Sequence, residues 1–137
     1  MAEPNAFVLD AFALLAYLQD EPEAARVEQL LEQALKEKCR LFVSIINLGE
    51  LLYIIERKGG ASKAQESLAL IQQLPIEILP ADEPAVFSSA HIKANHPLSY
   101  ADAFAVAAAM HANACILTGD TEFKGLELMV KVEWLEN

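Results

Sequence analysis

The sequence predicts an α/β protein, a three-layer α/β/α sandwich with a mostly parallel central sheet of four to five strands. Short apolar runs alternate with longer segments of helical periodicity, and parallel neighbours in a sheet need such helices as crossovers. The hydrophobic share is 54%, which suits a well-buried sheet. The chain of 137 residues has the size of one ordinary domain and no Gly/Ser-rich linker, so we expect residues 1–137 to form a single domain.

The first predicted strand and the two helices after it lie before residue 36. Residues 7–9 form an apolar run that Asp10 closes, and a helical rhythm follows to about residue 18. Pro22 suits the first turn of a second helix. Its apolar residues recur at 27, 30, 31, 34 and 35, which places them on one face.

The second predicted strand, residues 41–44, precedes a long helix. Asn47 can cap this helix, Glu50 stands three positions later, and the helix is expected to run to Lys58. Gly59 and Gly60 then end it. Its apolar residues cover more than one face, so the surplus can meet a partner subunit.

The second half of the chain repeats the alternation. A helix over about 62–74 leads to a strand at 76–79, and Asp82 opens a helix that ends before Pro97. Ser99 caps a helix of mostly small residues, which can lie close against a sheet. A strand at 114–118 and a last strand near 130–134 complete the order β-α-α-β-α-α-β-α-α-β-β.

Four acidic residues stand where apolar segments stop or helices begin: Asp10, Glu50, Asp102 and Asp120. In a parallel sheet these positions gather outside the carboxyl ends of the strands, so all four can converge. Taken singly, each has a structural interpretation, because Glu50 and Asp102 suit the third position of a capping box and Asp120 suits a turn. The set as a whole favours function.

Oxygen ligands without His or Cys among them suit Mg²⁺ or Mn²⁺ rather than zinc. Such an ion can lower the pKa of a bound water molecule and stabilise the charge that grows during displacement at a phosphodiester. The acidic residues therefore indicate metal-assisted hydrolysis of a phosphate ester. A haloacid-dehalogenase-like phosphatase fits less well, since Ala11 and Phe12 follow Asp10 where that class has a second Asp.

With these residues the chain resembles the PIN-domain ribonucleases, and most closely the small VapC-type toxins of toxin-antitoxin pairs. Four stretches carry the resemblance, and their order and spacing cover the chain nearly end to end. They are Val8-Leu-Asp10-Ala-Phe-Ala-Leu-Leu, Asn47-Leu-Gly-Glu50-Leu-Leu-Tyr, Leu98-Ser-Tyr-Ala-Asp102-Ala-Phe-Ala-Val-Ala-Ala-Ala and Ile116-Leu-Thr-Gly-Asp120-Thr-Glu-Phe123.

The resemblance implies a PIN-like fold in which Asp10, Glu50, Asp102 and Asp120 bind Mg²⁺ or Mn²⁺ and support cleavage of single-stranded RNA. It also implies a homodimer and a small antitoxin protein that blocks the site. Thr118 and Glu122 match flanking positions that often assist, with Glu122 where the family commonly has Asp.

Two features depart from this family pattern. Relatives usually carry Thr or Ser after the first Asp, whereas this chain has Ala11 and Phe12, which predicts a missing hydrogen bond near the metal. The formal net charge of −10 disfavours contact with RNA, and only Lys93 and Lys124 are expected near the acidic edge to bind phosphate. The alternative function is therefore a catalytically weak PIN-like binding or regulatory module that acts through dimerisation or a partner protein.

Composition restricts the cellular context. Acidic residues interrupt the best apolar stretches, so no membrane span is expected, and the first residues lack the basic start of a secretory signal. Cys39 and Cys115 stand alone without zinc spacing, so neither a disulfide nor a metal role is expected for them. We expect a cytoplasmic protein.

Overall fold

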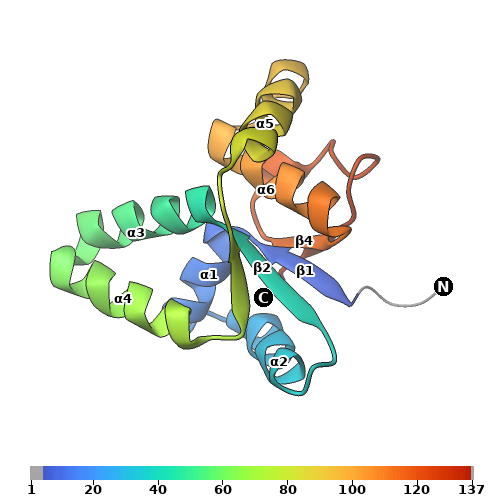
Figure 1. Ribbon diagram of the computed structural model, residues 1–137. Coiled ribbons are helices and arrows are strands. Elements are labelled where there is room, and N and C mark those ends of the chain that lie inside the picture. Colours follow the sequence, from blue (N-terminus) through green and yellow to red (C-terminus); the bar gives the residue numbers. More distant parts are fainter. Residues whose placement is uncertain (1–4, 137) are drawn as a thin grey trace.

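The computed structural model describes residues 5–136 and confirms the predicted α/β architecture (Figure 1). All five strands of the central sheet run parallel, in the order β3-β2-β1-β4-β5. Their bounds are β1 Ala6–Leu9, β2 Arg40–Ser44, β3 Ile76–Leu79, β4 Cys115–Thr118 and β5 Val132–Trp134.

The helices connect these strands in the order expected from the sequence. They are α1 (Ala11–Leu18), α2 (Ala24–Leu35), α3 (Ile45–Gly59), α4 (Ala61–Gln73), α5 (Glu83–Asn95) and α6 (Tyr100–Ala112), with a short 3-10 helix η1 (Thr121–Phe123) after β4. Within residues 5–136, no helix is long and apolar enough to cross a membrane.

Alternation along the central strands divides the core into two layers. Phe7 and Leu9 of β1 pack with helices α1 to α4 on one face of the sheet, whereas Val8 packs with α5 and α6 on the other. Five of the seven alanines of α6 are buried, Ala103, Ala105, Ala107, Ala108 and Ala109, as expected for a helix that lies close against a sheet. Helices therefore cover both faces, and only the ends and edges of the sheet are free to form a site.

Helix α3 begins three residues before the position predicted for it. Ser44 is the cap, with its hydroxyl oxygen accepting the Ile46 N–H at 3.2 Å. The prediction that Asn47 caps this helix, with Glu50 at the third position, is therefore wrong. Both Ser and Asn are good caps, and the buried strand ends at Ser44, so the first suitable residue after the strand takes the position.

Two smaller differences concern α2. Pro22 lies in the turn before the helix rather than in its first turn. Leu35, at the end of the predicted apolar face, is 71% exposed because the helix ends there. The other members of that face, Val27, Leu30 and Leu31, are buried as predicted, and Ala34 packs against them.

Candidate metal centre

Asp10 and Thr118 end neighbouring strands and contact each other at the sheet edge. β1 pairs with β4 so that Leu9 lies opposite Leu117, which brings the next residue of each chain segment side by side. Asp10 is 2% exposed and caps α1, where its Oδ1 accepts the Ala13 N–H at 2.9 Å. Its Oδ2 accepts a hydrogen bond from the Thr118 hydroxyl.

The same hydroxyl orders the turn that carries Asp120. Thr118 Oγ1 accepts the Asp120 N–H at 2.9 Å while it donates to Asp10. Asp120 in turn caps η1, because its Oδ1 accepts the Glu122 N–H at 2.9 Å. A chain of hydrogen bonds therefore runs from Asp10 through Thr118 and Asp120 to the backbone of Glu122.

Asp102 reaches the site from the first turn of α6. Ser99 caps this helix, with its Oγ accepting the Asp102 N–H at 3.1 Å. Glu122 accepts the Ser99 N–H at 3.0 Å, the bond that Asp102 would accept in a complete capping box. Asp102 is 4% exposed, and its Oδ2 has no hydrogen-bond partner within the described residues.

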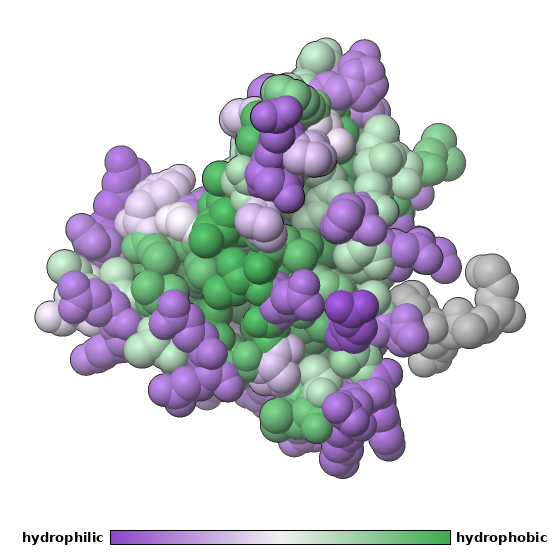
Figure 2. Space-filling model, viewed as in Figure 1, coloured by the Kyte–Doolittle hydropathy of each residue, from purple (hydrophilic) through white to green (hydrophobic). Residues whose placement is uncertain are grey.

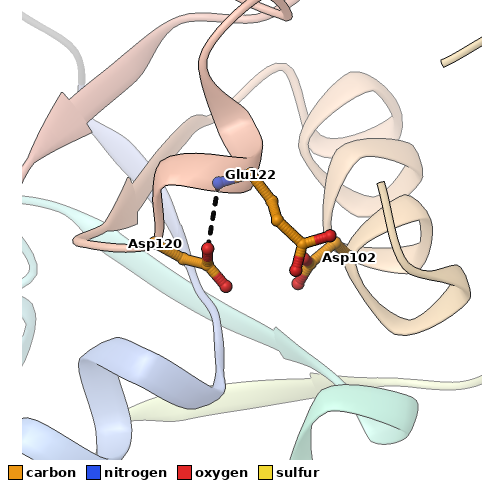
Figure 3. Close-up of side chains that lie close together, drawn as sticks. All are labelled: Asp102, Asp120 and Glu122. Atoms are coloured by element: carbon orange, nitrogen blue, oxygen red, sulfur yellow. Dashed lines mark hydrogen bonds between the residues drawn. The ribbon is translucent and has the colours of Figure 1, made fainter. Parts of the chain in front are cut away.

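Three carboxylates meet where these segments converge. One oxygen from each of Asp102, Asp120 and Glu122 lies within 4.8 Å of the others. Figure 3 shows the side chains of Asp120 and Glu122 directed toward Asp102. Asp102 is buried, Asp120 half-buried and Glu122 exposed, so the acidic cluster of these three residues opens from the interior to solvent.

Asp10 and Glu50 lie beside the acidic cluster rather than in it. Neither belongs to the group of described carboxylates that meets the 4.8 Å limit. Both are near enough to feel the charge of Asp120, which contributes to raising the pKa of each. The structure thus gathers the four predicted acids at one edge, but it places Glu122 closer to Asp102 and Asp120 than the other two.

Burial and mutual repulsion favour the protonated form of these acids when no cation is bound. Desolvation raises the pKa of Asp10 to about 7, against the hydrogen bonds from Thr118 and Ala13. Burial likewise raises the pKa of Asp102, and the charges of Asp120 and Glu122 raise it further. Burial is the largest cause of the raised pKa of Glu50 as well.

The donor set fits a hard divalent cation. Its ligands are all carboxylate oxygens, which Mg²⁺ and Mn²⁺ prefer over the softer zinc set of His and Cys. Leaving a buried polar atom such as Asp102 Oδ2 unpaired costs about 1–3 kcal/mol or more, and a bound cation offsets that cost. Asp102, Asp120 and Glu122 would hold such an ion, with Asp10 and Glu50 beside it.

Comparison with protein-family models matches residues 7–127 to the PIN domain. The chain belongs to the PIN-domain family. This match covers most of the chain and confirms the family that the sequence motifs indicated. Among curated protein sequences, none matches the chain.

Solved structures of similar fold include several VapC and VapBC proteins. VapBC2 from Rickettsia felis bound to a promoter DNA fragment matches with a TM-score of 0.77 and 17% identity, over 96% of this chain and 99% of that chain. VapC20 from Mycobacterium tuberculosis, a sarcin-ricin loop cleaving toxin, matches with a TM-score of 0.68 and 15% identity, over 87% and 93%. VapBC-5 from the same organism, of the VapBC family of toxin-antitoxin systems, matches with a TM-score of 0.61 and 20% identity, over 98% of this chain and 100% of that chain. These likenesses show a shared fold.

The departure from the PIN pattern after Asp10 has a structural counterpart. Ala11 is buried and supplies no hydroxyl, but Thr118 donates the hydrogen bond to Asp10 from the neighbouring strand. Phe12 is 39% exposed and its ring lies against Gly119, where a side-chain carbon would come within 2.3 Å of Phe12 Cε1. Asp10 therefore receives a side-chain hydrogen bond from β4 although the residue after it carries no hydroxyl.

The lysines expected near the acidic edge make no ion pair within the described residues. Lys124 caps the end of η1, two residues after Glu122, and Lys93 lies in the last turn of α5; both are exposed. Ion pairs among residues 5–136 join Arg26 to Glu133 and Arg40 to Glu77 instead. Neither lysine neutralises the acidic cluster of this PIN domain.

Asn47 is a residue of the site whose place was not foreseen. It lies in the first turn of α3 with 0% exposure, and its Nδ2 donates to the Ala101 carbonyl oxygen at 3.0 Å. The only signal for it in the sequence was a polar residue three positions before Glu50, and the same signal is typical of a helix cap.

Proposed function

We propose that this PIN domain is a metal-dependent endoribonuclease that hydrolyses phosphodiester bonds in single-stranded RNA. The observation that carries the proposal is the acidic cluster, in which the buried Asp102 keeps an unpaired oxygen beside Asp120 and Glu122. Several carboxylates at one edge of the sheet repel each other, which lowers the stability of the folded protein. A bound cation offsets this repulsion, so cation binding is the function that such a cluster indicates.

Bound Mg²⁺ or Mn²⁺ supplies Lewis acidity toward a phosphate oxygen and a lowered pKa for water. Asp102 would hold the ion from the start of α6, and Asp120 and Glu122 would hold it from the turn after β4. Asp10, fixed by Thr118 and Ala13, holds a carboxylate beside them. Glu50, half-buried on α3, can accept a proton, because its raised pKa brings it closer to that of a general base at neutral pH.

Two solved structures of similar fold suggest the biological role. VapC20 is a sarcin-ricin loop cleaving toxin, and VapBC-5 is a member of the VapBC family of toxin-antitoxin systems. We infer that this chain is the toxin of such a pair in the cytoplasm, with a small antitoxin that covers the site.

A homodimer is part of the same proposal. Strand β3 lies at an edge of the sheet, and apolar side chains beside it are incompletely covered. Ile45 is 46% exposed. The other members are partly buried: Leu52, Ile76 and Ile78 pack on the core layer of α1 to α4, and Leu79 packs on the layer of α5 and α6. Figure 2 shows a continuous apolar area in the middle of this face, bordered by hydrophilic residues. A second copy is the occupant we propose for it.

Cleavage of single-stranded RNA in Mg²⁺ or Mn²⁺ tests the proposed function. We expect Asp10→Asn and Asp102→Asn to reduce the rate by at least about 100-fold, because Asp102→Asn removes a proposed ligand of the cation and Asp10→Asn removes the carboxylate beside it. Glu56→Gln is the matched control, since Glu56 is an exposed acid on the same helix as Glu50 and should keep full activity.

Cleavage that survives both Asn variants would come from a contaminant and would refute the assignment. Absence of metal binding with retained dimerisation would instead favour the binding or regulatory module.

A further inference from the structure

Asn47 is the least expected polar residue of the core. It is completely buried within a helix, and one of its amide hydrogens is used by the Ala101 carbonyl oxygen at 3.0 Å. Its Oδ1 is buried and has no hydrogen-bond partner among the residues described. Asn is also a weak helix former compared with the leucines around it.

This environment does not favour Asn for stability. A buried amide with an unpaired oxygen destabilises the folded state, whereas an apolar residue of the same size would fill the space without that penalty. A residue that disfavours stability at the edge of a site is a candidate for a functional role. The contacts of Asn47 indicate which role.

Asn47 joins two elements that each carry an acid of the site. It precedes Glu50 by three residues on α3, which places the two side chains on neighbouring positions of one helix face. Its partner Ala101 directly precedes Asp102 in the first turn of α6.

We propose that Asn47 is a positioning residue of the metal centre, which fixes the first turn of α6, and with it Asp102, relative to Glu50. The inference rests on the proposed metal-dependent function and deepens it by assigning a residue that acts through the ligands. Asn47 itself needs no contact with the ion or with RNA.

Asn47→Leu separates this role from a structural one. Leucine keeps the volume and removes the unpaired oxygen, so we expect a melting temperature equal to or above that of the unchanged protein. We expect Mn²⁺ affinity, measured by calorimetry, to fall about tenfold or more, as for other residues that orient metal ligands. Amide hydrogen exchange in the first turn of α6, measured in a chelator, should become faster.

Ser89→Ala is the matched control, since Ser89 is also 0% exposed and its hydroxyl donates to the Ala85 carbonyl oxygen of its own helix at 2.7 Å. It should leave Mn²⁺ affinity unchanged. Asn47→Ala provides the same comparison if the leucine variant does not fold. Mn²⁺ affinity within twofold of the unchanged protein in the folded Asn47 variant would overturn the inference.

RNA cleavage by the unchanged protein, measured in parallel, keeps the two claims apart. Cleavage together with unaltered Mn²⁺ affinity in the Asn47 variant overturns the positioning role alone. Weakened Mn²⁺ binding in that variant without RNA cleavage by the unchanged protein supports the positioning role and refutes the nuclease.

Discussion

Thr118 is the residue on which the geometry of the acids depends most. It is completely buried, donates its hydroxyl proton to Asp10 and accepts the Asp120 N–H with the same oxygen. One hydroxyl thus fixes a carboxylate at the end of β1 and the turn after β4. Valine has nearly the same shape as threonine but can neither donate nor accept a hydrogen bond. The variant Thr118→Val therefore tests the contribution of the hydroxyl alone.

We expect Thr118→Val to lower the cleavage rate by about 10- to 100-fold, the usual effect of removing a group that orients a metal ligand. Thr118→Ser retains the hydroxyl and should restore most of the rate. Steady-state cleavage assays on the three proteins make the comparison. Equal rates for the valine and serine variants would show that the hydroxyl has no part in the reaction.

Glu122 illustrates what the sequence left open at this scale. Its motif position indicated an assisting role, but the structure places its carboxylate with Asp102 and Asp120. The reason is local. The 3-10 helix η1 turns the chain directly after Asp120, and the Ser99 N–H donates a hydrogen bond to the Glu122 carboxylate, which holds it beside the start of α6. A turn of three residues leaves no periodic signal in a sequence, so this arrangement could not be read from the pattern.

Among the elements, α6 has the most direct influence on the site, because its first turn carries Asp102. Ser99 caps that turn through its side chain and is tied to η1 through its N–H group. Asp82 caps α5 in the same way, with Oδ1 accepting the Ala85 N–H at 3.1 Å, but α5 carries none of the proposed ligands. The two caps therefore form a natural pair for comparison.

Ser99→Ala and Asp82→Ala should each lower the free energy of unfolding by about 1 kcal/mol, the usual contribution of a helix cap. Only Ser99→Ala should also weaken Mn²⁺ binding, because only that helix carries a ligand in its first turn. Denaturant unfolding and calorimetry measure the two quantities. Equal effects of both variants on Mn²⁺ affinity would contradict the proposed role of the α6 terminus.

Element order and the parallel sheet followed from the sequence because apolar runs and helical periodicity depend on local residue spacing. The caps at Asp82 and Ser99 were predicted correctly for the same reason. The start of α3 was not, since Ser44 and Asn47 are both suitable caps and only the end of the neighbouring strand decides between them. The buried contact of Asn47 depends on α6, which lies far away in the sequence.

For the whole molecule, the buried acids link stability to pH. The pKa of Asp10 is about 7 in the folded protein and its ordinary value is 3.8, so the folded state holds a proton that the unfolded chain releases between these values. Stability of the protein without a cation therefore falls as pH rises from about 4 to about 7. Burial of Asp102 acts in the same direction.

We expect the melting temperature in a chelator to decrease between pH 5 and pH 8, and Mg²⁺ or Mn²⁺ to raise it most at pH 8, where the carboxylates are ionised. Thermal melts across this range measure the effect. Asp10→Asn should flatten the curve in the chelator, because it removes a titrating group from the core. A melting temperature that increases with pH in the chelator would be inconsistent with buried, protonated acids.

The central claim is that Asp102, Asp120 and Glu122 hold a divalent cation, and a crystal soaked in Mn²⁺ tests it most directly through anomalous scattering. We predict a peak bounded by oxygens of these three carboxylates at distances of about 2.1 Å. No peak at this position at saturating Mn²⁺, or a peak only at acids elsewhere on the surface, would contradict the account.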